Sequence, residues 1–131
     1  MSSGLLCVSV NLIPMGLGKI MDFHYMCPRY EKVMELLGKR WTGLIIRALM
    51  EEPRRFTAIK TYVEGLSDRL LSERLQELEE AGIVERRVYA QRPVVIEYAL
   101  SEKGEDLRGI VEAIQTWADR WIVAEEQPTA R

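Results

Sequence analysis

The stretch that decides the fold is residues 66–87, LSDRLLSERLQELEEAGIVERR. Ser67 is a residue type that favours the N-cap of a helix, and Gly82 suits the left-handed position that ends one. At about 100° of rotation per residue, Leu71, Leu75 and Leu78 fall on one side of the helix. The opposite side carries four polar residues, which are Arg69, Ser72, Glu73 and Gln76. The sequence therefore predicts a helix over residues 68–80 with one leucine face, one polar face and a strand directly behind it.

Three helices are predicted before this stretch. The first begins at Pro28 and is closed by Gly38, with an apolar stripe at i, i+3, i+4 and i+7 formed by Tyr30, Val33, Met34 and Leu37. The second, KRWTGLIIRALMEEP, ends before Pro53, and its expected core stripe is Trp41, Leu44, Ile45 and Leu49. Residues 54–56 are expected to be extended. Thr57 is expected to cap a third, short helix that turns Ile59 and Val63 inward.

Two strands and a last helix are predicted after it. Residues 83–89 and 94–100 form a hairpin, with Pro93 in the loop where its missing N–H is harmless. Ser101 caps one final helix, whose apolar stripe is Leu107, Ile110, Val111, Ile114, Trp117, Ala118 and Trp121. The expected fold is mainly α with a small β-hairpin, an α+β arrangement.

Composition and charge limit the possible classes of protein. The chain has 131 residues, 47% hydrophobic and 29% charged, with a net charge of −2. This fits one globular domain over 21–123, a leader over 1–20 that is either a flexible arm or an upstream start artefact, and a polar tail over 124–131. No apolar run is long enough to cross a bilayer, so no membrane partner and a cytoplasmic location are expected. The charges are uneven, however: residues 1–60 carry nine Lys and Arg against five Asp and Glu. A slightly acidic chain can therefore present a basic face.

The order of elements predicts a winged helix-turn-helix. Two helices joined by the turn EGLS form the helix-turn-helix, and the hairpin over 83–100 forms the wing. In that geometry the second helix lies in the major groove of double-stranded DNA. A polar helix face is usually only solvated, but the ordered combination with a basic wing is more specific than either part. The predicted DNA-binding residues are Ser67, Asp68, Arg69, Ser72, Glu73, Gln76, Arg86, Arg87 and Arg92. Among them, Arg92 at the wing tip is expected to reach a minor groove.

Several motifs carry a family resemblance in order. CPRYEKVMELLGKRWTGLIIRALMEEPRRF, LSDRLLSERLQELEEAGIVERR and YALSEKG resemble the HxlR-type winged helix-turn-helix regulators, which are relatives of the MarR group. The resemblance covers Cys27 to about Trp121. It implies a homodimeric transcription regulator, most similar to the thiol-based repressors that sense quinones and other electrophiles. Several of those pair an N-terminal cysteine with one near the C-terminus. This chain has no cysteine after Cys27, so sensing would use Cys27 alone, Cys27 with its symmetry mate, or Cys7.

Cys27 is the candidate redox-sensing residue. It precedes Pro28 at a helix N-terminus, where the helix dipole favours the thiolate, and Arg29 and Lys32 add positive charge. A thiolate is the form that attacks quinones and peroxides. The alternative is that Cys27 is a small buried packing residue, because free cysteines are among the most buried residues.

The last helix is the candidate dimer interface. Its apolar stripe is too large for one small domain to cover, and paired recognition helices would read a palindromic operator. The expected interface residues are Leu107, Ile110, Ile114, Trp117 and Trp121. The alternative is that the tryptophans only cover the core.

Enzymatic function is not expected. His24 is the single histidine and lies outside the motifs above, so a Ser-His-Asp or Cys-His system has no place. No phosphate-binding loop precedes a helix, and neither a cofactor nor a metal is expected. The expected function is a homodimeric DNA-binding repressor with possible electrophile sensing. The alternatives are a winged-helix protein-interaction module and a regulator that answers to another small molecule.

Overall fold

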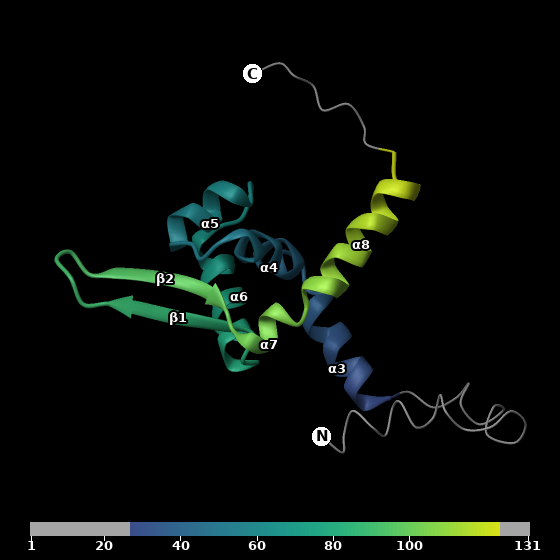
Figure 1. Ribbon diagram of the computed structural model, residues 1–131, viewed down its shortest axis with the longest axis horizontal. Coiled ribbons are helices and arrows are strands. Elements are labelled where there is room, and N and C mark those ends of the chain that lie inside the picture. Colours follow the sequence, from purple (N-terminus) through teal and green to yellow (C-terminus); the bar gives the residue numbers. More distant parts are fainter. Residues whose placement is uncertain (1–26, 124–131) are drawn as a thin grey trace, which may run out of the picture. The chain divides into compact units, whose positions relative to one another are not determined.

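The computed structural model describes residues 27–123. The chain divides into two compact units, Met1–Thr42 and Gly43–Arg131, and each is described separately. The elements are labelled as in Figure 1. In chain order they are α3 (Pro28–Leu37), α4 (Thr42–Glu51), α5 (Phe56–Tyr62), α6 (Asp68–Glu80), β1 (Val84–Tyr89), β2 (Val95–Leu100), α7 (Glu102–Glu105) and α8 (Arg108–Trp121). The predicted fold, mainly helical with one hairpin, is confirmed. The predicted leader and polar tail lie outside the described residues.

In the first unit, α3 begins and ends as the sequence predicts. Pro28 occupies its first turn behind the N-cap Cys27, and Gly38 is its C-cap. Gly38 is right-handed, and a Cβ built on it would lie 2.5 Å from the Met34 carbonyl oxygen, so close approach rather than left-handedness favours glycine there. No residue of α3 is buried, and its apolar residues Tyr30, Val33 and Met34 are exposed.

The expected core stripe of α4 was partly wrong. Ile45 and Leu49 are buried as predicted, but Leu44 is about half exposed and Trp41 is only partly covered. Trp41 precedes the helix, with a left-handed φ of 82°, so the helical spacing does not extend to it. The face that packs contains Ile45, Ile46, Ala48 and Leu49.

The core of the second unit forms around the leucine face of α6. Leu71, Leu75 and Leu78 are completely buried, as are Ile46 of α4 and Ile59 of α5. Fully burying one such side chain stabilises the fold by about 1.5–3 kcal/mol. The buried apolar residues that surround them include Val63, Leu66, Ile83, Val84, Ala99 and Leu100.

The helix α5 starts two residues earlier than predicted. Its N-cap is Arg55, which makes no side-chain capping bond, so the prediction that Thr57 caps this helix was wrong. Thr57 lies inside the first turn, where its carbonyl oxygen accepts a hydrogen bond from Thr61 Oγ1 at 3.1 Å. The inward positions of Ile59 and Val63 are confirmed. Gly65, with a φ of 85°, lies in the turn between α5 and α6.

Both ends of α6 are fixed by the residues that the sequence indicated. Ser67 Oγ accepts a hydrogen bond from the Leu70 amide at 3.2 Å. At the other end, the Gly82 amide donates to Glu79 O and the Ile83 amide to Leu78 O, both at 2.9 Å. With a φ of 76° at Gly82, this pair of bonds is a Schellman motif, and it leads the chain directly into β1.

The wing is an antiparallel hairpin, with Val84 opposite Leu100 and Tyr89 opposite Val95. It projects away from the helices of its unit in Figure 1, with the loop at the far end. Arg54 pairs with Tyr98 of β2 through two backbone hydrogen bonds of 2.8 and 2.9 Å. The extended piece predicted over 54–56 is thus reduced to a single bridge, because Phe56 already belongs to α5.

The predicted last helix is two helices. Ser101 caps the short α7 as expected, but α8 restarts at Arg108. The Leu107 amide bonds to the Gly104 carbonyl oxygen, three residues back rather than four, and this tight turn interrupts the helix. Arg108 then donates to the Met50 carbonyl oxygen at 2.8 Å, which ties the start of α8 to the end of α4. Among the described helices, none is both long and apolar enough to cross a membrane.

Candidate nucleic-acid interface

The outer face of α6 is the main feature of the candidate site. Arg69, Ser72, Glu73 and Gln76 are all exposed, whereas the three leucines opposite them are buried. The helix has 13 residues, which corresponds to about 20 Å of length. Arg69, Ser72 and Gln76 can donate hydrogen bonds along this accessible surface, and Ser72, Glu73 and Gln76 can accept them, as the sequence predicted.

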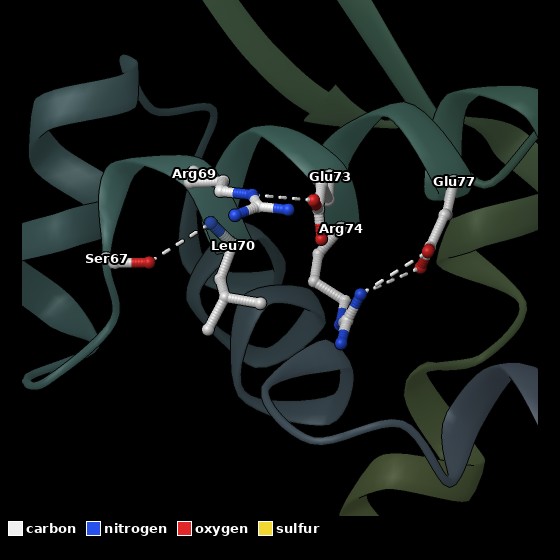
Figure 2. Close-up of polar contacts among 6 residues, drawn as sticks. All are labelled: Ser67, Arg69, Leu70, Glu73, Arg74 and Glu77. Carbon is white, nitrogen blue, oxygen red and sulfur yellow. Dashed lines mark hydrogen bonds and ion pairs between the residues drawn. The ribbon is translucent and has the colours of Figure 1, made fainter.

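Arg69 and Glu73 of this face are paired with each other (Figure 2). Arg69 Nε lies 3.2 Å from Glu73 Oε1. Gln76 donates to Glu80 Oε1 at 3.3 Å. Arg74, which was not among the predicted residues, makes a further pair with Glu77, again at 3.3 Å, and is largely covered. Carboxylates thus hold the basic and amide groups of α6 in defined positions.

The N-terminus of α6 is occupied by protein groups. The Ser67 hydroxyl binds the Leu70 amide, and the Asp68 carboxylate lies 2.6 Å from Lys60 Nζ of α5. A carboxylate in the first turn of a helix is stabilised by the helix dipole. Ser67 and Asp68 therefore have structural roles here, and the ion pair links the two helices of the helix-turn-helix.

The three wing arginines differ in their surroundings. Arg87 donates to Glu85 at 3.3 Å, and this hydrogen bond is the largest of the causes that raise the pKa of its guanidinium. Arg87 also stands opposite Glu97 in the register of the hairpin. Arg86 points to the other face of the hairpin, since neighbouring residues of a strand alternate, and both Arg86 and Arg92 are exposed. Arg86 and Arg92 are thus the wing arginines best placed to meet another molecule.

Sequence reasoning missed the residues that hold the end of α6. Lys103 Nζ donates to the Ala81 carbonyl oxygen at 2.7 Å, and Ser101 Oγ donates to Ile83 O at 3.1 Å. A Cβ on Gly104 would lie 2.2 Å from the same Ile83 oxygen. The motif SEKG, residues 101–104, therefore docks α7 against the C-terminal end of α6. The signal was in the sequence, but only the capping role of Ser101 was inferred from it.

The candidate dimer residues lie on α8. Trp117 is 60% and Trp121 65% exposed, and Ile110 and Ile114 are also exposed, whereas Leu107 is half-buried. None of the residues of α8 is fully buried. Most of the surface of Trp117 and Trp121 is therefore not covered by their own unit.

Cys27 is the N-cap of α3, with extended backbone angles, and it is half-buried. It is disulfide-bonded in this structure, and the other cysteine of that bond lies outside the described residues. The residue thus stands at a helix N-terminus, as the sequence predicted.

A separate cleft of about 390 Å³ lies between α4 and α8. It is lined by charged and polar groups from both helices, mainly Arg47, Glu51, Arg108, Glu112, Gln115 and Thr116. Arg108 is already engaged there by Met50 O and by Glu105.

A helix-turn-helix with an exposed polar helix face, followed by a hairpin carrying exposed arginines, defines a winged-helix DNA-binding protein. Residues 36–126 match the family described as HxlR-like helix-turn-helix. The chain belongs to this family and is a transcription regulator of the HxlR type.

Relatives within the family are similar over most of their length. The chain is 47% identical over 96 residues to the HTH-type transcriptional regulator YodB of Bacillus subtilis (strain 168), covering 73% of this chain and 86% of YodB. A structure of quinone-bound YodB from B. subtilis superposes with a TM-score of 0.64 at 47% identity, covering 73% of this chain and all of that one. The redox regulator HypR in its oxidised form gives a TM-score of 0.69 at 30% identity, covering 73% of this chain and 99% of HypR.

Proposed function

We propose that this regulator is a homodimeric repressor that reads a palindromic operator with the outer face of α6. We further propose that it releases the operator when Cys27 reacts with a quinone or another electrophile. The observation that carries the DNA-reading part is the exposed face of Arg69, Ser72, Glu73 and Gln76 opposite a fully buried leucine face.

The dimensions and chemistry of α6 suit the major groove. That groove is about 12 Å wide and accepts a helix, and each base pair displays a distinct set of donors and acceptors in it. Arginine pairs with guanine and glutamine with adenine through two hydrogen bonds each. Arg69 and Gln76 are the groups on this face that match those pairings.

Dimer formation through α8 is supported by its uncovered apolar side chains. An aromatic side chain buries about 150–250 Å² when fully covered, and a stable interface needs roughly 800 Å² per partner. Trp117 and Trp121 would therefore supply a substantial part of such an interface, and Ile110, Ile114 and Leu107 would extend it. Two copies related by a two-fold axis would place two α6 helices against the two halves of a palindrome.

Electrophile sensing by Cys27 is supported by its place at the start of α3 and by the relatives. Once the disulfide of Cys27 is reduced, its thiolate would add to a ring carbon of a quinone, forming one C–S bond, and the reduced ring would take up the proton as a hydroquinone. With diamide, two thiols would form a disulfide while the N=N bond accepts two electrons and two protons. YodB, at 47% identity, has a quinone-bound structure, which supports this class of inducer for the present chain.

The reading of bases is tested with Arg69→Ala and Gln76→Ala. Each variant is expected to lose about 1–3 kcal/mol of binding free energy on the specific duplex, with a much smaller loss on a random one. The stability of the fold should hardly change, because both side chains are exposed. Equal weakening on the specific and the random duplex would show that α6 touches only the phosphate backbone.

The cleft between α4 and α8 favours one alternative, a regulator that answers to a small molecule other than an electrophile. Its lining carries both arginines and glutamates, which would suit a ligand that carries both charges. Loss of operator binding on addition of a metabolite, with Cys27→Ser behaving like the parent chain, would support this alternative. The other alternative is a protein-interaction module. In that case any binding to duplex DNA would lack the steep salt dependence that phosphate contacts produce.

A further inference from the structure

One edge of the Arg69 guanidinium is held by an ion pair with Glu73. Arg69 is the second residue of α6, its side chain is 89% exposed, and its Nε lies 3.2 Å from Glu73 Oε1. Within residues 27–123, its two terminal nitrogens have no hydrogen-bond partner. Figure 2 shows the carboxylate of Glu73 beside the Nε edge, one helical turn further along α6.

Helix stability does not explain this pair. A cation in the first turn is opposed by the partial positive charge of the helix N-terminus. The order is also the weaker one, since a carboxylate four residues before a cation stabilises a helix better than the reverse. The pair is largely exposed, and exposed ion pairs contribute little to folding. The pair therefore contributes little to the stability of the fold.

The geometry suits one acceptor pattern. Occupying Nε leaves the two terminal nitrogens as a pair of parallel donors, and guanine presents two acceptors, O6 and N7, on its major-groove edge. A phosphate could also bind that pair, but the Glu73 carboxylate would then face a second anion. When Arg69 binds guanine, the Glu73 carboxylate instead faces the paired cytosine, whose N4 amino group is a donor. Glu73 thus favours a G·C pair and disfavours the backbone.

We propose that Glu73 is a specificity-determining residue that positions Arg69 for guanine and suppresses its contact with phosphate. This proposal rests on the proposed reading of bases by α6. It predicts that removing the carboxylate makes Arg69 a non-specific phosphate ligand, so that binding to random DNA rises while discrimination falls.

The test compares Glu73→Gln, Arg69→Ala and the double variant in the full chain. The probes are a duplex selected by the parent protein from a random pool and a random duplex of the same length. Glu79→Gln is the control, because it removes one negative charge from the same helix at a residue without an ion pair among those described. Affinity is measured for both duplexes over a series of salt concentrations.

Glu73→Gln is expected to bind the random duplex a few-fold more tightly, with a plot of log K against log salt steeper by about one, because one phosphate contact is gained. The ratio of specific to random affinity should fall by about tenfold, the size of a lost bidentate base contact. Glu79→Gln should keep the ratio within about twofold of the parent, since only the general charge changes. With Arg69 already replaced by alanine, Glu73→Gln should no longer alter the ratio.

Three results would overturn the proposal. The ratio of specific to random affinity could stay unchanged in Glu73→Gln. It could also fall as much when Arg69 has been replaced by alanine as when Arg69 is present. Affinity for the selected duplex could also fall while that for the random duplex stays constant, which would mean that Glu73 itself reads a base. If α6 does not read bases at all, the result is different, because Arg69→Ala alone would then weaken binding to both duplexes equally.

Discussion

Replacing Gly104 by alanine tests how the end of α6 is held. The new Cβ would lie 2.2 Å from Ile83 O and 3.2 Å from both the carbonyl carbon and Cγ2 of Ile83. The nearest atom is backbone, so α7 has to move away from α6. That movement strains the bond from the Ser101 amide to Ile83 O at 2.9 Å, the Ser101 hydroxyl bond and the Lys103 bond to Ala81 O.

The expected loss follows from these contacts. Each hydrogen bond contributes about 0.5–1.5 kcal/mol, so weakening three of them costs roughly 2–4 kcal/mol. Alanine is better than glycine in a helix by up to about 1 kcal/mol, which offsets part of the loss. The net effect should be a decrease of about 1–3 kcal/mol in the free energy of unfolding.

Urea unfolding at a fixed protein concentration measures the change, because the stability of the proposed dimer would depend on concentration. Gly109→Ala is the matched control: it is also a helical glycine, but a Cβ there meets nothing within 4 Å. This control should gain about 0.5–1 kcal/mol of stability. If Gly104→Ala is as stable as the parent chain, or gains stability like Gly109→Ala, the close approach of α7 to Ile83 is not what holds α6.

Three further outcomes are expected. Ser67→Ala should lower the free energy of unfolding by about 1 kcal/mol, because it removes the hydrogen bond to Leu70, whereas Ser72→Ala on the exposed face should leave it unchanged. Equal losses for the two variants in urea unfolding would contradict the capping role of Ser67. Arg92→Ala should weaken binding most on operators with A·T-rich flanks in gel shifts, and a uniform loss across flanks would indicate a plain phosphate contact. Charged residues in place of Ile114 and Trp121 should give monomers by light scattering that no longer bind the palindrome, and a monomeric parent chain would disprove the proposed interface.

The part of the fold that local chemistry determines could be predicted from the sequence. Ser67, Gly82 and the leucine spacing of α6 each act within a few residues, so its bounds, caps and buried face were all predicted correctly. The hairpin followed from alternation and from the loop around Pro93.

The errors arose where a distant contact or an unusual backbone decides the structure. The left-handed backbone at Trp41 places this residue outside α4 and so outside the predicted stripe, and no spacing rule reports a positive φ at a tryptophan. The break between α7 and α8 depends on a three-residue turn at Leu107. Gly104 approaches Ile83, which is 21 positions away in the chain, so its role appears only in three dimensions.

The candidate site divides in the same way. Exposure of Arg69, Ser72, Glu73 and Gln76 follows from helical periodicity and could be predicted. The pairing of Asp68 with Lys60 and of Arg87 with Glu85 could not, because each depends on side-chain conformations on two elements or along a strand. Arg87 is already engaged in such a pair, so Arg86 and Arg92 are the wing arginines that remain available.

Release of the operator through Cys27 is tested most directly by a gel-shift titration with a quinone and with diamide, each carried out on the reduced parent chain, Cys27→Ser and Cys7→Ser. The parent chain should lose the operator with both reagents, because the Cys27 thiolate can form an adduct or a disulfide. Cys27→Ser should hold the operator throughout, and Cys7→Ser should still let go with the quinone, because an adduct needs only one thiol. If Cys27→Ser releases DNA as the parent chain does, or if the parent chain ignores both reagents, Cys27 is a structural residue and the regulator answers to a different signal.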